Sequence, residues 1–249
     1  MNGDSRRDVV TYGDDGGIRI FRNEASGFTP TTVTPSGEWN LAVGDLTGDG
    51  RPDIAACGVN FVIDVFVQNT SGGFTVQTYD RACGDDLVIA DFTGDGRNDL
   101  ASNGISTQVF PQTTAGTLGA PDTYVGLSHG YLAAGDLNAD GRADLLAIAH
   151  HASEFIQLSQ LENGRMAAAP IIYRALYWDG PMAIGDVTGD GKADVVLAQN
   201  GGTLVTFPHA ASDAPAPLDP GEFWLEDIAP HDFRTRRPRG HRSCPRFRQ

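Results

Sequence analysis

One nine-residue string occurs four times in the chain, and this recurrence constrains the fold more than any other feature. The string reads DLTGDGRPD at 45–53, DFTGDGRND at 91–99, DLNADGRAD at 136–144 and DVTGDGKAD at 186–194. The first aspartates of successive strings lie 46, 45 and 50 residues apart. A period of this length is typical of a chain that stacks one supersecondary unit several times. The sequence therefore predicts a repeat protein.

Each string has the composition of a calcium-binding loop. Positions one, three, five and nine carry side-chain oxygens, and position six is always glycine. Calcium needs about six to eight oxygen ligands, and a short loop supplies them only by turning sharply at a residue that tolerates positive φ. We therefore predict up to four calcium sites, in which position seven adds its backbone carbonyl and points its side chain outward. The predicted ligands are Asp45, Thr47, Asp49, Arg51 and Asp53; Asp91, Thr93, Asp95, Arg97 and Asp99; Asp136, Asn138, Asp140, Arg142 and Asp144; and Asp186, Thr188, Asp190, Lys192 and Asp194.

Two alternatives to a calcium loop exist. Asp-Gly with neighbouring Asn and Thr favours a hairpin turn without any metal, but three carboxylates in nine residues would then repel one another with nothing to offset the cost. An EF-hand needs a glutamate at position twelve and flanking helices. Position twelve is alanine, serine or leucine in these strings. We therefore favour a calcium loop between strands.

The segments around each loop indicate β-structure. Short apolar runs precede the loops (LAVGD, LVIAD, LAAGD and MAIGD) and follow them (IAAC, LASN, LLAI and VVLA). A β-rich stretch comes next (VIDVFVQN, STQVFPQ, EFIQLSQ and GTLVTF), then often a glycine-containing turn and another alternating run. Such runs are typical of strands, about four per period. The sequence therefore predicts an all-β protein, a β-propeller of four-stranded blades.

On these motifs the chain resembles the FG-GAP/VCBS repeat family, whose blades carry a DxDxDGxxD calcium loop between their first two strands, as in the integrin α-subunit head. The resemblance extends over about nine-tenths of the chain. It implies a β-propeller, calcium in the loops and a secreted protein. Position three is Thr or Asn here and more commonly Asp in the family. The lower ligand charge predicts modest affinity, around the 10⁻⁴–10⁻³ M range of extracellular modules.

Both ends of the chain carry part of one further unit. Residues 2–8 (NGDSRRD) fit positions three to nine of the loop, with Ser5 in place of the glycine. Near the other end, IAPHDF contains Asp232 and parallels the AIGDV that opens the fourth loop. Joined, the two ends would form a composite blade and close a ring of five. The alternative is a fragment of a larger propeller, for example one of seven blades.

The repeat pattern stops at Phe233, so we assign residues 1–233 to the propeller and 234–249 to a tail. The tail holds seven of the eighteen basic residues and no acidic one. Arginine–proline runs are typical of a shifted reading of GC-rich coding sequence, and Lys192 is the single lysine of the chain. We favour a frameshifted or disordered tail. A functional basic tail that binds nucleic acid or an anionic surface is the alternative.

Charge limits the partners of the propeller region. Residues 1–233 hold 32 acidic and 11 basic residues, a formal charge of −21, which opposes binding to nucleic acid. No apolar run is long enough to span a membrane. Met1 opens directly on a repeat motif, without a signal peptide. We expect an extracellular monomer, or a module of a larger secreted protein whose export signal lay upstream.

Two cysteines are placed for a disulfide. Cys57 ends the second strand of one blade, and Cys83 precedes the first strand of the next. We therefore expect both on one rim, with Cα atoms within about 7 Å, the reach of a disulfide. Two free buried thiols are the alternative. Cys244 belongs to the tail.

Catalytic motifs are scarce. GLSHG at 126–130 matches the G-x-S-x-G nucleophile elbow, but that motif requires a strand-to-helix turn. A strand follows here, so Ser128 is not expected to be a nucleophile. Asp85 and Asp86 are expected to extend a turn. No metal-ligand spacing is found among the scattered histidines His129, His150, His151 and His209.

Two classes of function fit the sequence. We favour a non-catalytic, calcium-binding module for recognition or adhesion that binds a protein or a glycan. The alternative is a secreted enzyme on a propeller scaffold, such as a polysaccharide lyase or hydrolase, or its accessory domain. The fold alone cannot separate the two. A cleft lined by aromatic, His, Arg and acidic side chains would discriminate between them. The candidate residues are Tyr131, Tyr173, Tyr177 and Trp178. Packing in the core is an equally good explanation for these four side chains.

Overall fold

The fold is described from a computed structural model. It describes residues 1–14, 17–34, 38–80, 83–124, 130–150, 154–167, 171–174, 180–199 and 203–208. These residues form five antiparallel sheets and one short 3₁₀ turn, η1 (Val59–Phe61). Among the described residues, no helix has the length and apolar character needed to cross a membrane.

Each sheet is one blade, numbered in chain order. Blade 1 contains β1 (Val9–Tyr12), β2 (Ile18–Glu24) and β3 (Gly27–Thr32). Blade 2 contains β4 (Glu38–Gly44), β5 (Asp53–Gly58), β6 (Val62–Gln68) and β7 (Phe74–Tyr79). Blade 3 contains β8 (Asp86–Ala90), β9 (Asp99–Asn103), β10 (Thr107–Phe110) and β11 (Asp122–Tyr124). Blade 4 contains β12 (Gly130–Gly135), β13 (Asp144–Ala149), β14 (Glu154–Leu158) and β15 (Ile171–Arg174). Blade 5 contains β16 (Met182–Gly185), β17 (Asp194–Gln199) and β18 (Thr203–Phe207).

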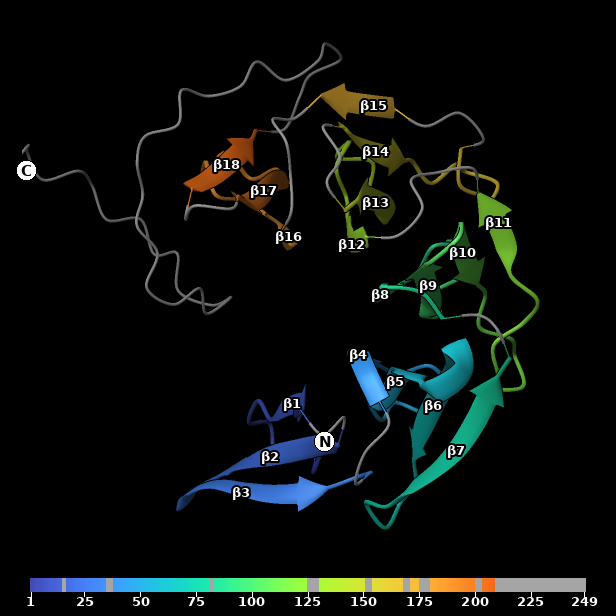
Figure 1. Ribbon diagram of the computed structural model, residues 1–249, viewed down its shortest axis with the longest axis vertical. Coiled ribbons are helices and arrows are strands. Elements are labelled where there is room, and N and C mark those ends of the chain that lie inside the picture. The colour runs from blue at the N-terminus through green and yellow to red at the C-terminus, as the bar shows by residue number, and fades with distance from the viewer. Residues whose placement is uncertain are drawn as a thin grey trace, which may run out of the picture.

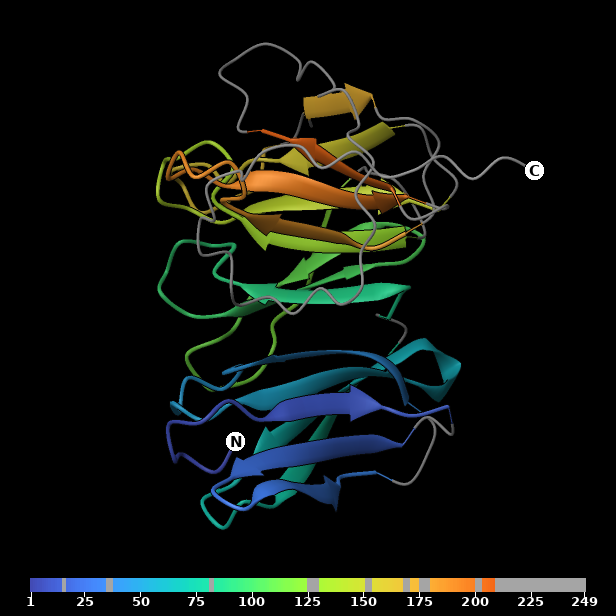
Figure 2. The ribbon, with the colours of Figure 1, turned by 90° about the vertical axis from the view of Figure 1, so that its left-hand side faces the viewer.

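The blades follow one another around a central opening, with β4, β8, β12 and β16 nearest to it (Figure 1). Consecutive strands of a blade pair with each other. The predicted all-β propeller with five blades is therefore confirmed. Seen edge-on, the strands cross the thickness of the ring (Figure 2), so the connections gather on two rims. We call the rim that carries the four repeated strings the loop rim, and the other the opposite rim.

The hydrophobic core lies between neighbouring blades. On β5, Ala55 and Cys57 belong to the layer shared with blade 3. Ile54 and Ala56, which alternate with them, belong to the layer shared with blade 1. All four side chains are fully buried. A strand with neighbours on both faces must be apolar at every position, which explains the short continuous apolar runs of the sequence.

The N-terminal segment folds as the predicted partial unit. Asp8 Oδ1 accepts the backbone N–H of Asn23 at 2.9 Å, as Asp53 accepts that of Gln68 at 2.9 Å in blade 2. Ser5 takes a positive φ of 65° where the complete loops have glycine. Strands β1 to β3 thus correspond to strands two to four of the other blades. Residues 225–230 with Asp232, which would complete blade 1, lie outside the described residues, as does the 234–249 tail.

A disulfide joins blades 2 and 3 at the opposite rim. Cys57 and Cys83 are bonded, with their Cα atoms 5.6 Å apart, so the predicted pairing on one rim is confirmed. The Cys83 N–H also donates to the Phe61 carbonyl at 3.0 Å. The disulfide and this hydrogen bond therefore hold Cys83, shortly before β8, against β5 and η1.

Replacing both bonded cysteines by alanine should lower the free energy of unfolding. The bond closes a segment with a sequence separation of 26, and the loss of that constraint on the unfolded chain costs about 3.5 kcal/mol by the chain-entropy relation. Urea denaturation of the oxidised protein measures the change. Cys244→Ala is the control and should leave the curve unchanged. Superposable curves for the parent with and without reductant would contradict the prediction.

Candidate metal-binding loops

The four strings occupy equivalent places in blades 2 to 5. Each begins directly after the first strand of its blade, and its ninth residue opens the second strand. The glycines at position six have φ between 80° and 83°, a conformation that side chains with a Cβ rarely adopt. The local sequence therefore determines the turn, and the strands on either side determine its place on the loop rim.

The position-one carboxylate holds the turn through backbone N–H groups. Asp45 Oδ1 accepts the N–H of Gly48 at 2.6 Å, and its Oδ2 accepts that of Gly50 at 2.8 Å. The second and fourth loops repeat both bonds at the same distances. The third loop keeps the second bond, from Gly141 to Asp136 at 2.8 Å. These carboxylates therefore shape the loop before any ligand is considered.

The position-nine carboxylate is buried and ties the loop to the third strand. Asp53 Oδ2 accepts the N–H of Leu46 at 3.0 Å, and its Oδ1 accepts that of Gln68 at 2.9 Å. The second and third loops repeat both bonds. All four position-nine aspartates are fully buried. Burial raises the pKa of Asp53, Asp99 and Asp144, although the backbone N–H groups act in the opposite direction.

Position three places a neutral oxygen beside these carboxylates. Thr47 Oγ1 lies 3.2 Å from Asp53 Oδ2 and 3.5 Å from Asp45 Oδ1. In the second loop, Thr93 Oγ1 is buried beside the equivalent carboxylate, Asp99. This oxygen and the two neighbouring carboxylates have the hard-oxygen chemistry that calcium prefers.

The position-five carboxylate contacts the residue at position seven. In the first loop both oxygens of Asp49 contact Arg51: Oδ1 accepts its backbone N–H at 2.9 Å, and Oδ2 pairs with its guanidinium. The guanidinium Nε also donates to the Gln68 carbonyl at 2.9 Å. The expectation that the position-seven side chain points outward is therefore wrong for this loop. The second and third loops show the same arrangement.

The structure thus brings together positions one, three and nine and directs position five toward residue seven. Among the described residues, no group of three or more His, Cys, Asp or Glu side chains is arranged to hold a metal ion. The donor types at positions one, three and nine fit calcium, and the position-five carboxylate would have to turn inward to join them. The calcium ligands therefore stay predictions.

The first two loops are each covered by a turn of the following blade. A Cβ on Gly116, in blade 3, would lie 2.9 Å from the Thr47 carbonyl oxygen, so this turn needs glycine to approach the first loop. Gln112 Nε2, also from blade 3, donates to the Asp45 carbonyl at 3.3 Å. Between the second loop and blade 4 lies a cavity of about 610 Å³, lined by residues that include Asp91, Arg142, Gln160 and Glu162.

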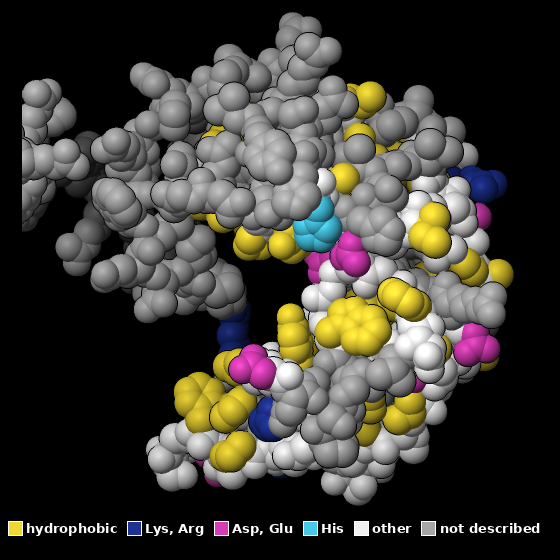
Figure 3. Space-filling view, viewed as in Figure 1, with side chains coloured by type: hydrophobic (Ala, Val, Ile, Leu, Met, Phe, Trp, Pro, Cys, Tyr) yellow, Lys and Arg dark blue, Asp and Glu magenta, His cyan; other side chains and the backbone are white. Residues whose placement is uncertain are grey.

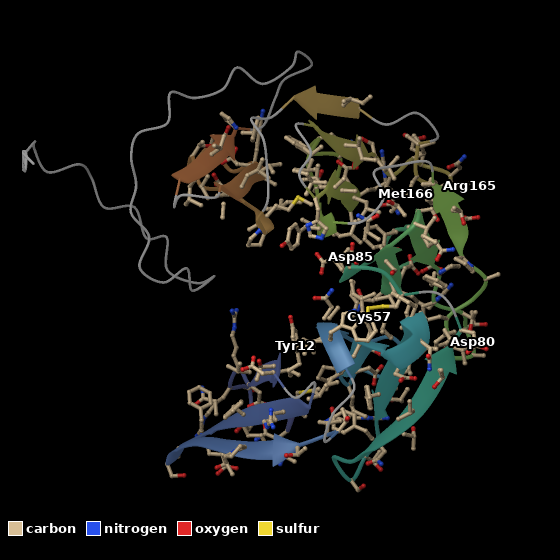
Figure 4. The ribbon with its side chains drawn as sticks, in the orientation of Figure 1. Tyr12, Cys57, Asp80, Asp85, Arg165 and Met166 are labelled. Carbon is tan, nitrogen blue, oxygen red and sulfur yellow. A yellow bond between two sulfur atoms is a disulfide. The ribbon has the colours of Figure 1, made fainter. Side chains whose placement is uncertain are left out.

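The opposite rim carries two groups of contacting side chains that we together call the aromatic–acidic strip: Trp39 with Phe61, and Asp85 with Tyr131 and His150. The Trp39 and Phe61 rings meet edge-to-face with centroids 6.2 Å apart. His150 Nε2 lies 3.6 Å from Asp85 Oδ2, and its ring meets Tyr131 at 5.0 Å. Asp85 lies at the central opening (Figure 4), where a histidine, acidic and hydrophobic side chains share one face (Figure 3).

Asp86, next to this strip, forms a contact between blades that the sequence did not predict. It opens β8, so the expectation that Asp85 and Asp86 merely extend a turn is wrong for Asp86, while Asp85 lies in the bend before the strand. Asp86 Oδ2 accepts the N–H of Leu132 in blade 4 at 2.9 Å, and burial raises the pKa of the Asp86 carboxyl. Two acidic residues directly before a short apolar run (LVIA) were the available signal. Other candidates lie outside the described residues or have undescribed side chains: Ser128, His129, His151, His209, Tyr173, Tyr177 and Trp178.

Comparison with known proteins identifies the repeats. A model of the FG-GAP-like repeat matches residues 1–56 and 136–197, which include the partial unit and three of the four loops. The matched segments are FG-GAP-like repeats of a five-bladed β-propeller. Among solved structures, it is similar to the V. cholerae biofilm matrix protein Bap1, with 15% identity and a TM-score of 0.47. The match covers 84% of this chain and 36% of that one. No curated protein matches the chain.

The position-nine carboxylates should be essential to the FG-GAP fold even without calcium. Asp99→Ala leaves the N–H groups of Phe92, Thr93 and Gln112 without their acceptor, which should cost roughly 3 kcal/mol or more. Asp95→Ala, the control in the same loop, removes a half-exposed ion pair and should cost less than about 1 kcal/mol. Urea denaturation in a chelator measures both. Equal losses would contradict this division of roles.

Proposed function

We propose that this propeller is a calcium-stabilised, non-catalytic module for recognition or adhesion outside the cell. The observation that carries the proposal is the buried carboxylate at position nine of all four loops. In three of them burial raises its pKa, so the charged form is disfavoured there. A divalent cation beside it would offset that cost.

The charge of the whole chain supports the same proposal. The formal net charge is −14 at pH 7, and a compact state of high net charge is destabilised by self-repulsion. Twelve carboxylates belong to the four strings. Calcium at affinities around 10⁻⁴–10⁻³ M would occupy such loops at extracellular concentrations and leave them empty in the cytosol. The disulfide between Cys57 and Cys83 also suits an oxidising compartment.

A calcium titration tests the metal part of the proposal. At a concentration about ten times the dissociation constant, each filled site adds roughly 1.4 kcal/mol to the stability of the folded state. The melting temperature should therefore rise between chelator and millimolar calcium, and less so in Asp49→Ala and Asp95→Ala. Magnesium, which demands a stricter octahedral geometry, is the control ion. A melt that does not respond to calcium would remove the metal from the function.

The aromatic–acidic strip is the surface best suited to recognition. Phe61 ends η1, the turn between β5 and β6 of blade 2, and its side chain is 65% exposed. Phe61 and Asn60 both have positive φ, 62° and 69°, and such strain in non-glycine residues is often retained at functional sites. An open aromatic ring with carboxylate and imidazole groups beside it supplies apolar contact and hydrogen bonds. Both a glycan and a polar peptide segment need that combination.

Ligand binding should depend on the strip. Glycan and protein arrays, screened with and without calcium, identify the bound class. Phe61→Ala and His150→Ala should then weaken binding at least about tenfold, since central aromatic contacts commonly contribute more than 1.4 kcal/mol. Phe28→Ala, at a 58% exposed phenylalanine of blade 1, is the matched control. Equal binding by all variants would exclude the strip, and shortened glycan products would favour the enzymatic alternative.

A further inference from the structure

Three of the four loops contain an internal cation. The guanidinium of the position-seven arginine pairs with the position-five carboxylate, as Arg51–Asp49, Arg97–Asp95 and Arg142–Asp140. In each loop the Nε of the same arginine donates to a carbonyl that follows the third strand or ends it, at 2.9, 3.0 and 3.1 Å. The arginine therefore joins the loop to its blade and neutralises one of its carboxylates.

This contact involves the whole position-five carboxylate. In the first loop Oδ1 of Asp49 accepts the Arg51 N–H at 2.9 Å while Oδ2 meets the guanidinium. Asp45 and Asp53 lie together around Thr47, as described above. For Asp49 to join them as a third ligand, its carboxylate must leave the guanidinium. The arginine and a bound cation would therefore compete for the same group.

The fourth loop has the chain's single lysine in this place. Lys192 donates its backbone N–H to Asp190 Oδ1 at 3.0 Å. In the described part of the chain, no hydrogen bond or ion pair joins the Lys192 ammonium to the Asp190 carboxylate. The Lys192 side chain is exposed, whereas the three arginines are half-buried. A lysine lacks the planar fork that lets arginine hold a carboxylate and a carbonyl together.

We propose that Arg51, Arg97 and Arg142 act as built-in counter-cations that compete with calcium, and that the fourth loop consequently binds calcium first. The inference rests on the proposed calcium function and assigns an order of filling to its sites. Exposed or half-exposed ion pairs of this kind correspond to a change of about 1.4-fold to fivefold in an equilibrium constant. The fourth loop should be tighter by up to that factor.

Reciprocal substitutions in the full chain test the order. The amide of each position-six glycine, which donates to the position-one aspartate, reports its own loop in a nitrogen-15 NMR titration with calcium chloride. In the parent, Gly191 should respond at the lowest concentration. Arg142→Lys should move the Gly141 midpoint down by up to about fivefold, and Lys192→Arg should move the Gly191 midpoint up by a similar factor.

A melt in chelator provides the second measurement. Arg142→Lys should lower the melting temperature without calcium, because the link from the loop to the Gln160 carbonyl is weakened, and should recover more of it with calcium. Midpoints that do not change, or that change in the opposite direction, overturn the competition while leaving calcium binding intact. No response of any loop glycine at about 10 mM calcium, above the 10⁻³ M range, overturns both the competition and the calcium function.

Discussion

The buried carboxylate at position nine is the interaction on which the rest of the structure depends. Asp53 accepts one N–H from the loop and one from the end of the third strand, so it joins three parts of a blade at a point that water does not reach. Asp99 and Asp144 do the same in blades 3 and 4. An acceptor that satisfies several buried donors cannot be replaced without leaving those donors unpaired. The carboxylate therefore sets the place of the loop within its blade.

With this arrangement, the loops are held in shape by the chain itself before any calcium binds. Their turns are closed by backbone N–H groups on the position-one carboxylate and, in three of the four loops, by an arginine on the position-five carboxylate. The fold of each loop is thus satisfied by groups of the chain itself. In the proposed function, calcium adds stability and relieves charge in a loop that is already shaped, and the chain's own arginines set how readily it binds.

The two rims divide structure and recognition between them. On the loop rim, turns from the next blade pack against the first two loops. On the opposite rim, the disulfide and the hydrogen bond from Cys83 to Phe61 hold the connections still, while Phe61 stays exposed. A rigid base under exposed aromatic and charged side chains lowers the entropic cost of binding a partner. We therefore place the proposed recognition surface on the rim opposite the predicted calcium loops.

The sequence by itself determined the repeat, the strands and the position of each loop, because turn chemistry and apolar runs are local properties of the chain. It also indicated the Cys57–Cys83 pair and the partial unit at residues 2–8, since both follow from counting along equivalent blades. Only the tertiary structure decided that Arg51 turns back onto Asp49 and that Asp86 bonds to the next blade. Side-chain direction depends on which acceptors neighbouring strands and blades bring within reach. Those neighbours are distant in sequence, and no local pattern records them.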